Sequence, residues 1–317
     1  MSTGSIDIRM NRPAERDAIL AFIAEMGFNP RDAVTWDGLG MVAMTAWDGG
    51  RLIGAIPLEP RPLRVAEGVT APAAHETVVA VRPEFRSRGI GSAMQAAIFE
   101  RPPAGARVIT VFREEPASAA YRWYVRNGFR AGVHIDSWFC DGRGDSADDR
   151  VEFFEVADAR LPWNWLDDVW RAARRPGGGL VDRTRRPLRE WLAVHPYRAR
   201  YRFGVAVDRG GAGYALYGVG SMHSRGERID VLEVVSAGAG PQTGERLVGA
   251  LLYCSKRCGA SPVRWPLAAG DPDVATATAL GFDKRWGFDM LVRPLDAELD
   301  LGGGVLAGWR YAGVDYI

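Results

Sequence analysis

The amino-acid sequence predicts an α/β (α+β) fold in two similar halves, each a mixed, mostly antiparallel sheet flanked by helices. The chain has 317 residues, of which 47% are hydrophobic, whereas a compact domain usually has about 100–150 residues. Strand-like and helix-like apolar patterns alternate along the chain. Their order repeats, because Asn127-Gly128-Phe129 and Leu280-Gly281-Phe282 each close a helix before a final strand. We therefore expect two domains with related folds.

In the first half, Asp48-Gly49-Gly50 lies between two apolar segments and predicts a hairpin turn. Gly128 follows an amphipathic segment and predicts the end of a helix. Residues 60–73 are expected to be a longer connection. The predicted strands cover residues 6–10, 41–47, 51–58, 75–81, 107–112 and 129–140. The predicted helices cover residues 11–26, 92–100 and 116–127, and residues 29–39 are expected to be a short helix and a loop.

Residues 141–150 are polar and rich in glycine, which is typical of a linker. They divide the chain into an expected first domain at residues 1–140 and a second at residues 151–317, which includes a C-terminal tail. The segment 162–202 is rich in Trp and Arg, but interspersed acids favour a packed pair of helices over a nucleic-acid surface. The predicted strands of the second domain are 201–207, 212–219, 229–235, 262–266 and 282–292, and its predicted helices are 163–174, 185–195, 244–258 and 272–280.

The composition limits the partners and the location of the protein. The formal net charge is +1, so the chain lacks the basic excess typical of nucleic-acid binding. The N-terminus has no apolar signal core, and no run of about 18 apolar residues could span a bilayer. Cys140, Cys254 and Cys258 form no Cys-x-x-Cys pair and are expected to be reduced thiols, not metal ligands. We expect a cytoplasmic monomer or homodimer that binds no metal, nucleic acid or membrane.

The segment from Val79 to Met94 carries the most specific functional signal. A β-branched strand is followed by an Arg- and Gly-rich turn, Arg86-Ser87-Arg88-Gly89-Ile90-Gly91, and then by a helix. Glycine lets the backbone approach a ligand closely, and free N–H groups at the start of a helix attract anions. Arginine adds charge and a bidentate geometry that suits phosphate oxygens. The turn therefore predicts a phosphate-binding site.

Two motifs in the first half resemble those of the GNAT superfamily of N-acetyltransferases. One is Val81-Arg-Pro83 followed by Arg86-x-x-Gly89-x-Gly91, and the other is Trp123-Tyr124-x-x-x-Gly128-Phe129. Each motif is weak alone because short glycine patterns recur by chance, but here both lie on the matching elements. The clear resemblance covers roughly residues 5–140, and the likeness over residues 150–295 is one of layout. The resemblance implies a tandem of two GNAT-like domains, the second of them degenerate.

The resemblance implies acetyl-CoA as the co-substrate. Backbone groups of Val79 and Val81 are expected to pair with the pantetheine arm. Tyr124 has the position of the family's tyrosine that protonates the departing thiolate, so we expect it to be the general acid. The pyrophosphate is expected to bind the N–H groups of the turn, which are those of Arg86, Ser87, Arg88, Gly89, Ile90, Gly91 and Ser92.

The base that removes the amine proton is open. An alkylamine has a pKa of about 10.4 and must lose a proton before it attacks a thioester. Members of the superfamily often have a glutamate six residues before the position of Val81, where this chain has His75. Strand alternation places His75 on the face of Val79 and Val81 and Glu76 on the other face, unless a bulge turns Glu76 inward. The candidates are His75, Glu76, a water chain and the C-terminal carboxylate.

The second half lacks both parts of this machinery. When Val235 is aligned with Val81, neither arginine of the turn has a counterpart, and Glu245 lies near the second glycine. A carboxylate at that position repels a pyrophosphate. Ala277 stands four residues before Gly281 and cannot donate a proton. We expect the second domain to stabilise the fold and to line the acceptor cleft.

The sequence therefore predicts an acetyl-CoA-dependent N-acetyltransferase that acts by direct transfer. The expected acceptor is a primary amine of a small molecule, such as an antibiotic or an amino-sugar-like metabolite. Two alternatives are a non-catalytic acyl-CoA-binding sensor and an acyltransferase that uses a different acyl donor.

Overall fold

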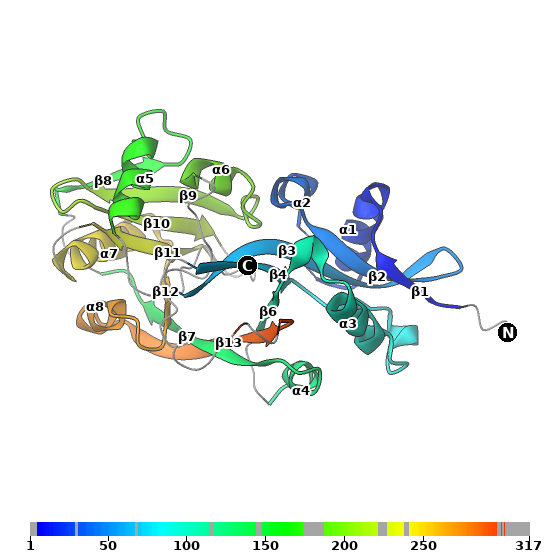
Figure 1. Ribbon diagram of the computed structural model, residues 1–317. Coiled ribbons are helices and arrows are strands. Elements are labelled where there is room, and N and C mark those ends of the chain that lie inside the picture. The colour runs from blue at the N-terminus through cyan, green and yellow to red at the C-terminus, as the bar shows by residue number, and fades with distance from the viewer. Residues whose placement is uncertain are drawn as a thin grey trace. The chain divides into compact units, whose positions relative to one another are not determined.

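The computed structural model describes residues 5–28, 31–66, 69–113, 117–143, 148–173, 187–220, 227–237, 241–296, 299 and 301. The chain divides into two compact units (Figure 1). Unit 1 contains the described residues within Met1–Val65, Val69–Gly132 and Met290–Gly302. Unit 2 contains Ala66 and the described residues within Val133–Asp289.

Unit 1 is built on a mixed sheet with the order β1-β2-β3-β4-β6, followed by the end of β13, and with β5 paired to β3. The pairs β1–β2, β2–β3 and β3–β5 are antiparallel, whereas β4 and β6 are parallel. The strands are β1 (Asp7–Met10), β2 (Val42–Asp48), β3 (Arg51–Ala66), β4 (Val69–Glu76), β5 (Ala80–Val81), β6 (Val108–Arg113) and β13 (Asp283–Pro294). The α-helices are α1 (Arg16–Glu25), α2 (Ala33–Leu39), α3 (Ile90–Glu100) and α4 (Ala119–Arg126).

Helices cover both faces of this sheet. On one face, α1 and α2 enclose a core that includes Phe22, Trp36 and Ala80. On the other face, α3 and α4 enclose a core that includes Met94 and Tyr124. Close packing fixes the second core tightly, since a Cβ on Gly54 of β3 would come within 2.9 Å of the Met94 Cε atom.

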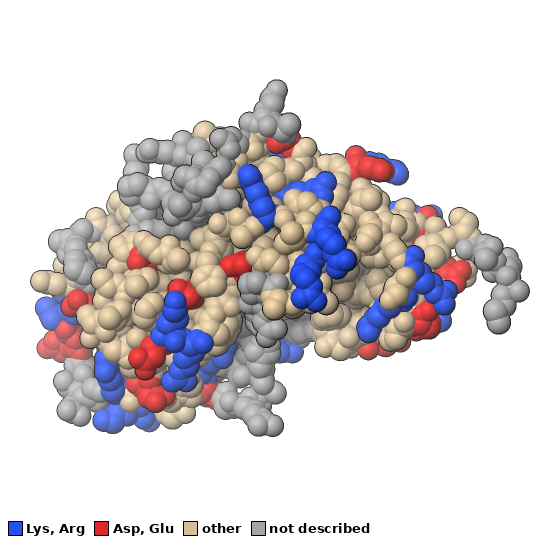
Figure 2. All heavy atoms as spheres, turned by 90° about the horizontal axis from the view of Figure 1, so that it is seen from below, with Lys and Arg blue, Asp and Glu red and all other residues tan. Residues whose placement is uncertain are grey.

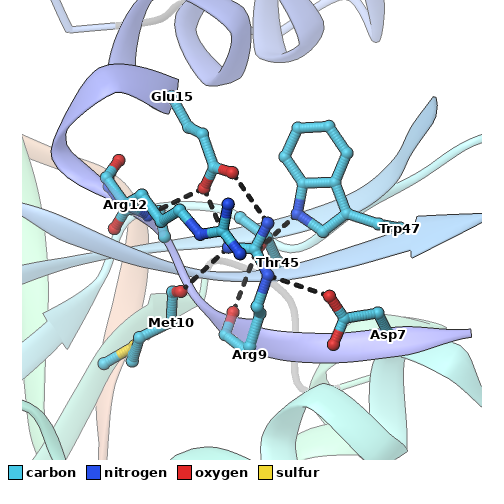
Figure 3. A network of polar contacts seen from close by, with 8 residues as sticks. Asp7, Arg9, Met10, Arg12, Glu15, Thr45 and Trp47 are labelled. Carbon is cyan, nitrogen blue, oxygen red and sulfur yellow. Dashed lines mark hydrogen bonds and ion pairs between the residues drawn. The ribbon is translucent and has the colours of Figure 1, made fainter. Parts of the chain in front are cut away.

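The start of α1 is held by a network of polar contacts (Figure 3). The Arg9 guanidinium on β1 donates to both carboxylate oxygens of Glu15, at 2.9 and 2.7 Å, and also to Asp7 at 2.9 Å. Glu15 in turn accepts from the backbone N–H of Arg12 at 2.7 Å. The Thr45 hydroxyl on β2 donates to the Arg9 carbonyl oxygen at 2.9 Å. These contacts tie the first helix to the edge of the sheet.

Unit 2 repeats the same plan, and its strand order is the start of β13, then β7-β12-β11-β10-β9-β8. The pairs β8–β9, β9–β10, β10–β11 and β12–β7 are antiparallel, and β11 and β12 are parallel. Its strands are β7 (Arg130–Cys140), β8 (Val151–Glu155), β9 (Tyr201–Asp208), β10 (Gly213–Gly220), β11 (Arg228–Ser236) and β12 (Val263–Ala268). Its helices are α5 (Trp163–Ala172), α6 (Leu188–Ala193), α7 (Pro241–Cys258) and α8 (Asp273–Ala279).

The compact units do not follow the order of the chain strictly. The strand β7 follows α4 in the sequence, yet Val133–Cys140 belong to unit 2. The end of β13, Met290–Pro294, belongs to unit 1 and lies next to β6 in its sheet. The expected division at residues 140 and 151 therefore remains a proposal about two GNAT-like halves. The folded units differ from it because each half contributes a terminal strand to the other unit.

Most of the predicted elements are confirmed within two or three residues, two predictions are wrong, and one strand was missed. The expected connection at residues 60–73 is mostly strand, because β3 continues to Ala66 and β4 begins at Val69. The expected strand 75–81 is divided between the end of β4 and the short β5. The strand β8 was not predicted. None of the helices that the structure describes is long and apolar enough to cross a membrane.

Candidate functional site

The turn that precedes α3 has the geometry of an anion-binding cradle. The α3 helix begins at Ile90, and its first backbone bond runs from the Ala93 N–H to the Gly89 carbonyl at 2.9 Å. The N–H groups of Ile90, Gly91 and Ser92 therefore precede the first helical bond and can donate to a ligand. Ser87 and Gly89 have positive φ angles of 60° and 78°. When residues with positive φ angles alternate with residues in other backbone conformations, their N–H groups form a concave row that can bind an anion.

The arginines of the turn lie beside this row. The Arg86 Nε donates to the carbonyl oxygen of Val81 at 3.0 Å, and the Arg88 guanidinium lies 5.2 Å from the centre of the Phe85 ring. The N–H of Arg82 donates to Ile53 of β3 at 2.9 Å. In an antiparallel pair, the backbone N–H and carbonyl groups of successive residues point alternately toward the partner strand and away from it. The backbone N–H and carbonyl of Val81 therefore point away from β3. This edge is the one expected to receive the pantetheine arm.

A β-bulge separates β4 from β5. Ala80 is paired with Ala55 of β3, whereas the Thr77 N–H donates to the Pro57 carbonyl at 3.1 Å. The three residue positions from Thr77 to Ala80 therefore lie opposite only two positions of β3, from Pro57 to Ala55. The segment thus contains one extra residue, which defines a bulge. Because side chains alternate between the two faces of a sheet, one extra residue moves every side chain before the bulge to the face opposite to the one expected for a regular strand.

The bulge places Glu76, not His75, on the α3 face. Val79 and Val81 pack against the core of α3 and α4, and the Glu76 carboxylate accepts a hydrogen bond from Gln95 of α3. The expectation that His75 shares the face of Val79 and Val81 is therefore wrong, because it assumed an uninterrupted strand. The alternative of a bulge that turns Glu76 inward agrees with the structure.

Glu76 and Tyr124 belong to one buried polar cluster. Both residues are 1% exposed. The Tyr124 hydroxyl accepts a hydrogen bond from the Arg113 Nη2 atom at 2.7 Å, and it interacts with the Glu76 carboxylate. Among the described residues, the second carboxylate oxygen of Glu76 (Oε2) has no hydrogen bond of standard geometry, and the same holds for Gln95 Oε1. We name these four residues, the buried Glu76, Gln95 and Tyr124 and the half-buried Arg113, the buried cluster.

Burial sets the protonation of the cluster. Desolvation raises the pKa of Glu76 to about 7, although the hydrogen bonds from Gln95 and Tyr124 and the charge of Arg113 act in the opposite direction. Desolvation and the Glu76 charge raise the pKa of Tyr124 well above 10, while Arg113 lowers it. A carboxyl group whose pKa is close to neutrality can both accept and release a proton at pH 7.

His75 lies on the opposite face of the sheet. Its Nδ1 atom lies 2.9 Å from the Thr110 hydroxyl, and its ring packs 4.9 Å from the Phe112 ring. Burial lowers the pKa of His75 well below 6.5, and the charges of Arg61 and Arg31 lower it further. His75 is therefore neutral near pH 7 and is separated from Tyr124 by the sheet.

The two sequence motifs meet in the structure. The Trp123 indole on α4 donates to the Ser92 hydroxyl on α3 at 3.2 Å. A Cβ on Gly91 would lie 3.7 Å from the Trp123 ring and 3.9 Å from Val79. The cradle, the strand edge and the helix of Tyr124 thus form one connected region of unit 1.

Gln95 and Arg113 were not singled out from the sequence. A polar Gln95 among the apolar residues of α3 and an Arg113 that closes the apolar strand β6 were the available signals. Neither is specific, because such residues often face solvent. The C-terminal carboxylate, another candidate base, lies outside the described residues.

Unit 2 repeats the helix end that carries Tyr124, but without the tyrosine. The Phe129 N–H donates to the Tyr124 carbonyl at 3.1 Å, and the Phe282 N–H donates to the Ala277 carbonyl at 2.9 Å. Gly128 and Gly281 have similar positive φ angles of 82° and 68°. The local backbone is therefore the same in both units, whereas the hydroxyl is present only in unit 1.

Comparisons with known proteins agree with this geometry. Residues 40–131 match the model of the acetyltransferase (GNAT) domain, which includes the cradle, the bulge and Tyr124. No curated protein matches the chain. The chain is thus similar to the acetyltransferase (GNAT) domain over residues 40–131.

Solved structures show the same fold over nearly the whole chain. A probable N-acyltransferase from Enterococcus faecalis is 14% identical with a TM-score of 0.67, covering 93% of this chain and 74% of that one. Eis1 from Mycobacterium abscessus is 20% identical with a TM-score of 0.61, with the same coverage of 93% and 74%. A tandem GNAT protein from the clavulanic acid biosynthesis pathway is 15% identical with a TM-score of 0.54, covering 92% and 99%. The fold that this chain shares with these proteins therefore extends over both units.

Proposed function

We propose that the protein is an acetyl-CoA-dependent N-acetyltransferase that transfers the acetyl group directly to a primary amine of a small molecule. The observation that carries the proposal is the contact between the two motifs, since Trp123 of α4 bonds to Ser92 at the start of α3. This contact fixes the anion-binding cradle relative to a buried tyrosine. Such an arrangement suits a ligand that has a pyrophosphate at one end and a thioester at the other.

In this proposal, the backbone N–H groups of residues 86–92 hold the pyrophosphate, and Arg86 and Arg88 neutralise it. The outward edge of Val81, extended to Val79, pairs with the pantetheine amides. The pyrophosphate and the pantetheine arm therefore bind mainly to backbone groups of the protein. Glycine at positions 89 and 91 suits this role, because it lets the backbone approach the ligand closely. The N–H groups and arginines of the turn fit the negative charge of the acetyl-CoA pyrophosphate.

Tyr124 and Glu76 are the proposed acid and base. Glu76 has a pKa of about 7 and takes the proton of the ammonium through water, since its side chain is 1% exposed. The neutral amine attacks the thioester carbon, and the carbon–sulfur bond breaks. Tyr124 gives its hydroxyl proton to the departing sulfur. His75 is a weaker candidate for the base because the bulge places it on the other face.

The second unit has a supporting role in this proposal. Ala277 replaces the tyrosine, and we assign the acetyl-CoA site to unit 1 alone. The end of β13 completes the sheet of unit 1 beside β6, so the second half of the chain contributes to the unit that carries the site. The three cysteines are free thiols, which supports a location in the reducing cytoplasm.

A small acceptor is favoured over a nucleic acid by the distribution of charge. On the face drawn in Figure 2, Lys and Arg side chains are interrupted by acidic and uncharged ones and form no continuous basic surface. Together with a net charge of +1, this does not resemble the surface of a nucleic-acid-binding protein.

Binding of acetyl-CoA tests the assignment of the cradle. Isothermal titration calorimetry would compare the wild type with the double variant R86E/R88E, and with R101E/R126E as a control that makes the same change of charge at exposed positions of unit 1. We expect the first variant to weaken binding by about 10²-fold or more, since each charge-assisted hydrogen bond contributes about 1.5–3 kcal/mol. Equal affinities in both variants would overturn the assignment.

A screen of small amines tests the activity. Acetylation of at least one amine, with release of one free thiol per acetyl group, supports the enzyme. Tight binding of acetyl-CoA without acetylation of any amine would instead favour an acyl-CoA-binding sensor.

A further inference from the structure

Arg113 is the charged member of the buried cluster that the proposed reaction leaves without a role. It is the last residue of β6, and its Nη1 atom donates to the carbonyl oxygen of Phe112 at 3.0 Å. The backbone bond fixes one side of the guanidinium. The other side, through Nη2, donates to the Tyr124 hydroxyl at 2.7 Å.

The guanidinium also packs against the tyrosine ring. Its central carbon lies 4.6 Å from the centroid of the Tyr124 ring. A cation at this distance stabilises the electron-rich face of an aromatic ring. Arg113 therefore contacts Tyr124 in two ways, one at the oxygen and one at the ring, and both become stronger when the ring carries negative charge.

The hydrogen-bond pattern sets the direction in which the hydroxyl points. Arginine has donors but no acceptor, so the Tyr124 oxygen must accept from Arg113 and must direct its own proton elsewhere. The Glu76 carboxylate is the acceptor that interacts with this hydroxyl. Glu76 from β4 and Arg113 from β6 are the charged groups that act on the hydroxyl, and Gln95 of α3 donates to Glu76.

We propose that Arg113 is a positioning residue for Tyr124, which aims the hydroxyl proton away from β6 and stabilises the phenolate formed when that proton passes to the departing sulfur. The inference rests on the proposed acetyl transfer. In this step the O–H bond of Tyr124 breaks and an S–H bond forms, while the phenolate keeps the electron pair beside the guanidinium. Glu76, which holds the proton taken from the amine, then returns a proton to the phenolate. The second nitrogen proton leaves to solvent as the amide forms, so each turnover moves one proton from nitrogen to sulfur and releases one to solvent.

The structure offers a reason why the phenolate needs such support. Tyr124 is 1% exposed, and burial together with the Glu76 charge opposes ionisation of its hydroxyl. A fixed donor that is already aimed at the oxygen costs no reorganisation when the charge forms. A water molecule or a flexible lysine would have to reorient.

The test compares R113M and R113K with R126M, which removes an exposed arginine from α4. With an amine that the wild type acetylates, R113M is expected to lower kcat by about 10²-fold, and R113K to restore part of the loss. In a Y124F background, R113M should cause no further loss of kcat at about pH 9, where Glu76 is ionised in both proteins, because Arg113 acts on proton transfer through the hydroxyl. Equal losses in the two backgrounds would show that Arg113 acts independently of Tyr124 and would overturn the inference.

The pH profile separates positioning from a structural role. Loss of the guanidinium charge is expected to move the lower inflection of kcat/KM upward by about one pH unit or more, since a cation near a carboxylate lowers its pKa by about that amount. R113K should keep the inflection near its original pH. A profile that does not move in R113M would contradict the inference.

A spectroscopic readout is independent of the proposed function. In protein labelled with ¹³C at the tyrosine Cζ atom, the Tyr124 resonance is identified by its absence in Y124F. We expect this resonance to shift in R113M and to stay in place in R126M. An unchanged resonance in R113M would refute the contact even if acetyl transfer is confirmed, whereas a shifted resonance in a protein that acetylates nothing would refute only the proposed function.

Discussion

Replacement of Glu76 by glutamine should make unit 1 more stable at alkaline pH and the enzyme less active. In the folded chain, burial raises the pKa of Glu76 from 4.5 to about 7. Between these pH values the folded chain binds a proton that the unfolded chain has lost, so stability falls as pH rises. The rise in pKa corresponds to about 3 kcal/mol, which is fully lost above pH 7. Glutamine has the same shape, can accept the hydrogen bond from Gln95, and carries no charge.

The assay is urea denaturation of the wild type and E76Q at several pH values between 4 and 9, without acetyl-CoA. The difference in free energy of unfolding between the two proteins should change by about 3 kcal/mol in favour of E76Q across this range. The exposed Glu100 provides the control, because E100Q makes the same change on α3, the helix that carries Gln95. We also expect E76Q to lower kcat by about 10²–10⁴-fold through loss of the base. A stability difference that is independent of pH would refute the assignment of a raised pKa to Glu76.

Two further changes test neighbouring parts of the account. In H75Q, the inflection of kcat/KM near pH 7 should persist, because burial keeps the pKa of His75 well below 6.5 and its ring bonds to Thr110; disappearance of the inflection would make His75 the base. R293M should lower the free energy of unfolding by about 1–3 kcal/mol, because Arg293 donates to the Asn127 carbonyl and lies 3.6 Å from the Phe99 ring centre. Thermal denaturation measures this, and an unchanged melting temperature would show that the donated strand end does not stabilise the helix of Tyr124.

The sequence was sufficient for most elements and for the turn geometry of the proposed cradle because both depend on local patterns. The Asp48-Gly49-Gly50 turn and the glycine after α4 act on their own neighbours in the chain. The cradle depends on consecutive residues whose backbone geometry follows from their identity, as the positive φ angle of Gly89 shows. Tyr124 could be proposed from the sequence because its motif lies within one helix and its cap.

The parts that could not be predicted depend on pairing between distant segments. The bulge between Thr77 and Ala80 is defined by register against β3, and no glycine or proline marks it in the sequence. One extra residue was enough to exchange the faces of His75 and Glu76. The contribution of Met290–Pro294 to unit 1 likewise follows from strand pairing across the whole chain.

The central claim is that Tyr124 protonates the departing thiolate at a single acetyl-CoA site. The most direct test is the kinetics of Y124F with an amine that the wild type acetylates, together with its affinity for acetyl-CoA. We expect kcat to fall by about 10²–10⁴-fold, as for the loss of a general acid, while the dissociation constant of acetyl-CoA changes little because the cradle is intact. A Y124F enzyme with the kcat of the wild type would contradict the claim.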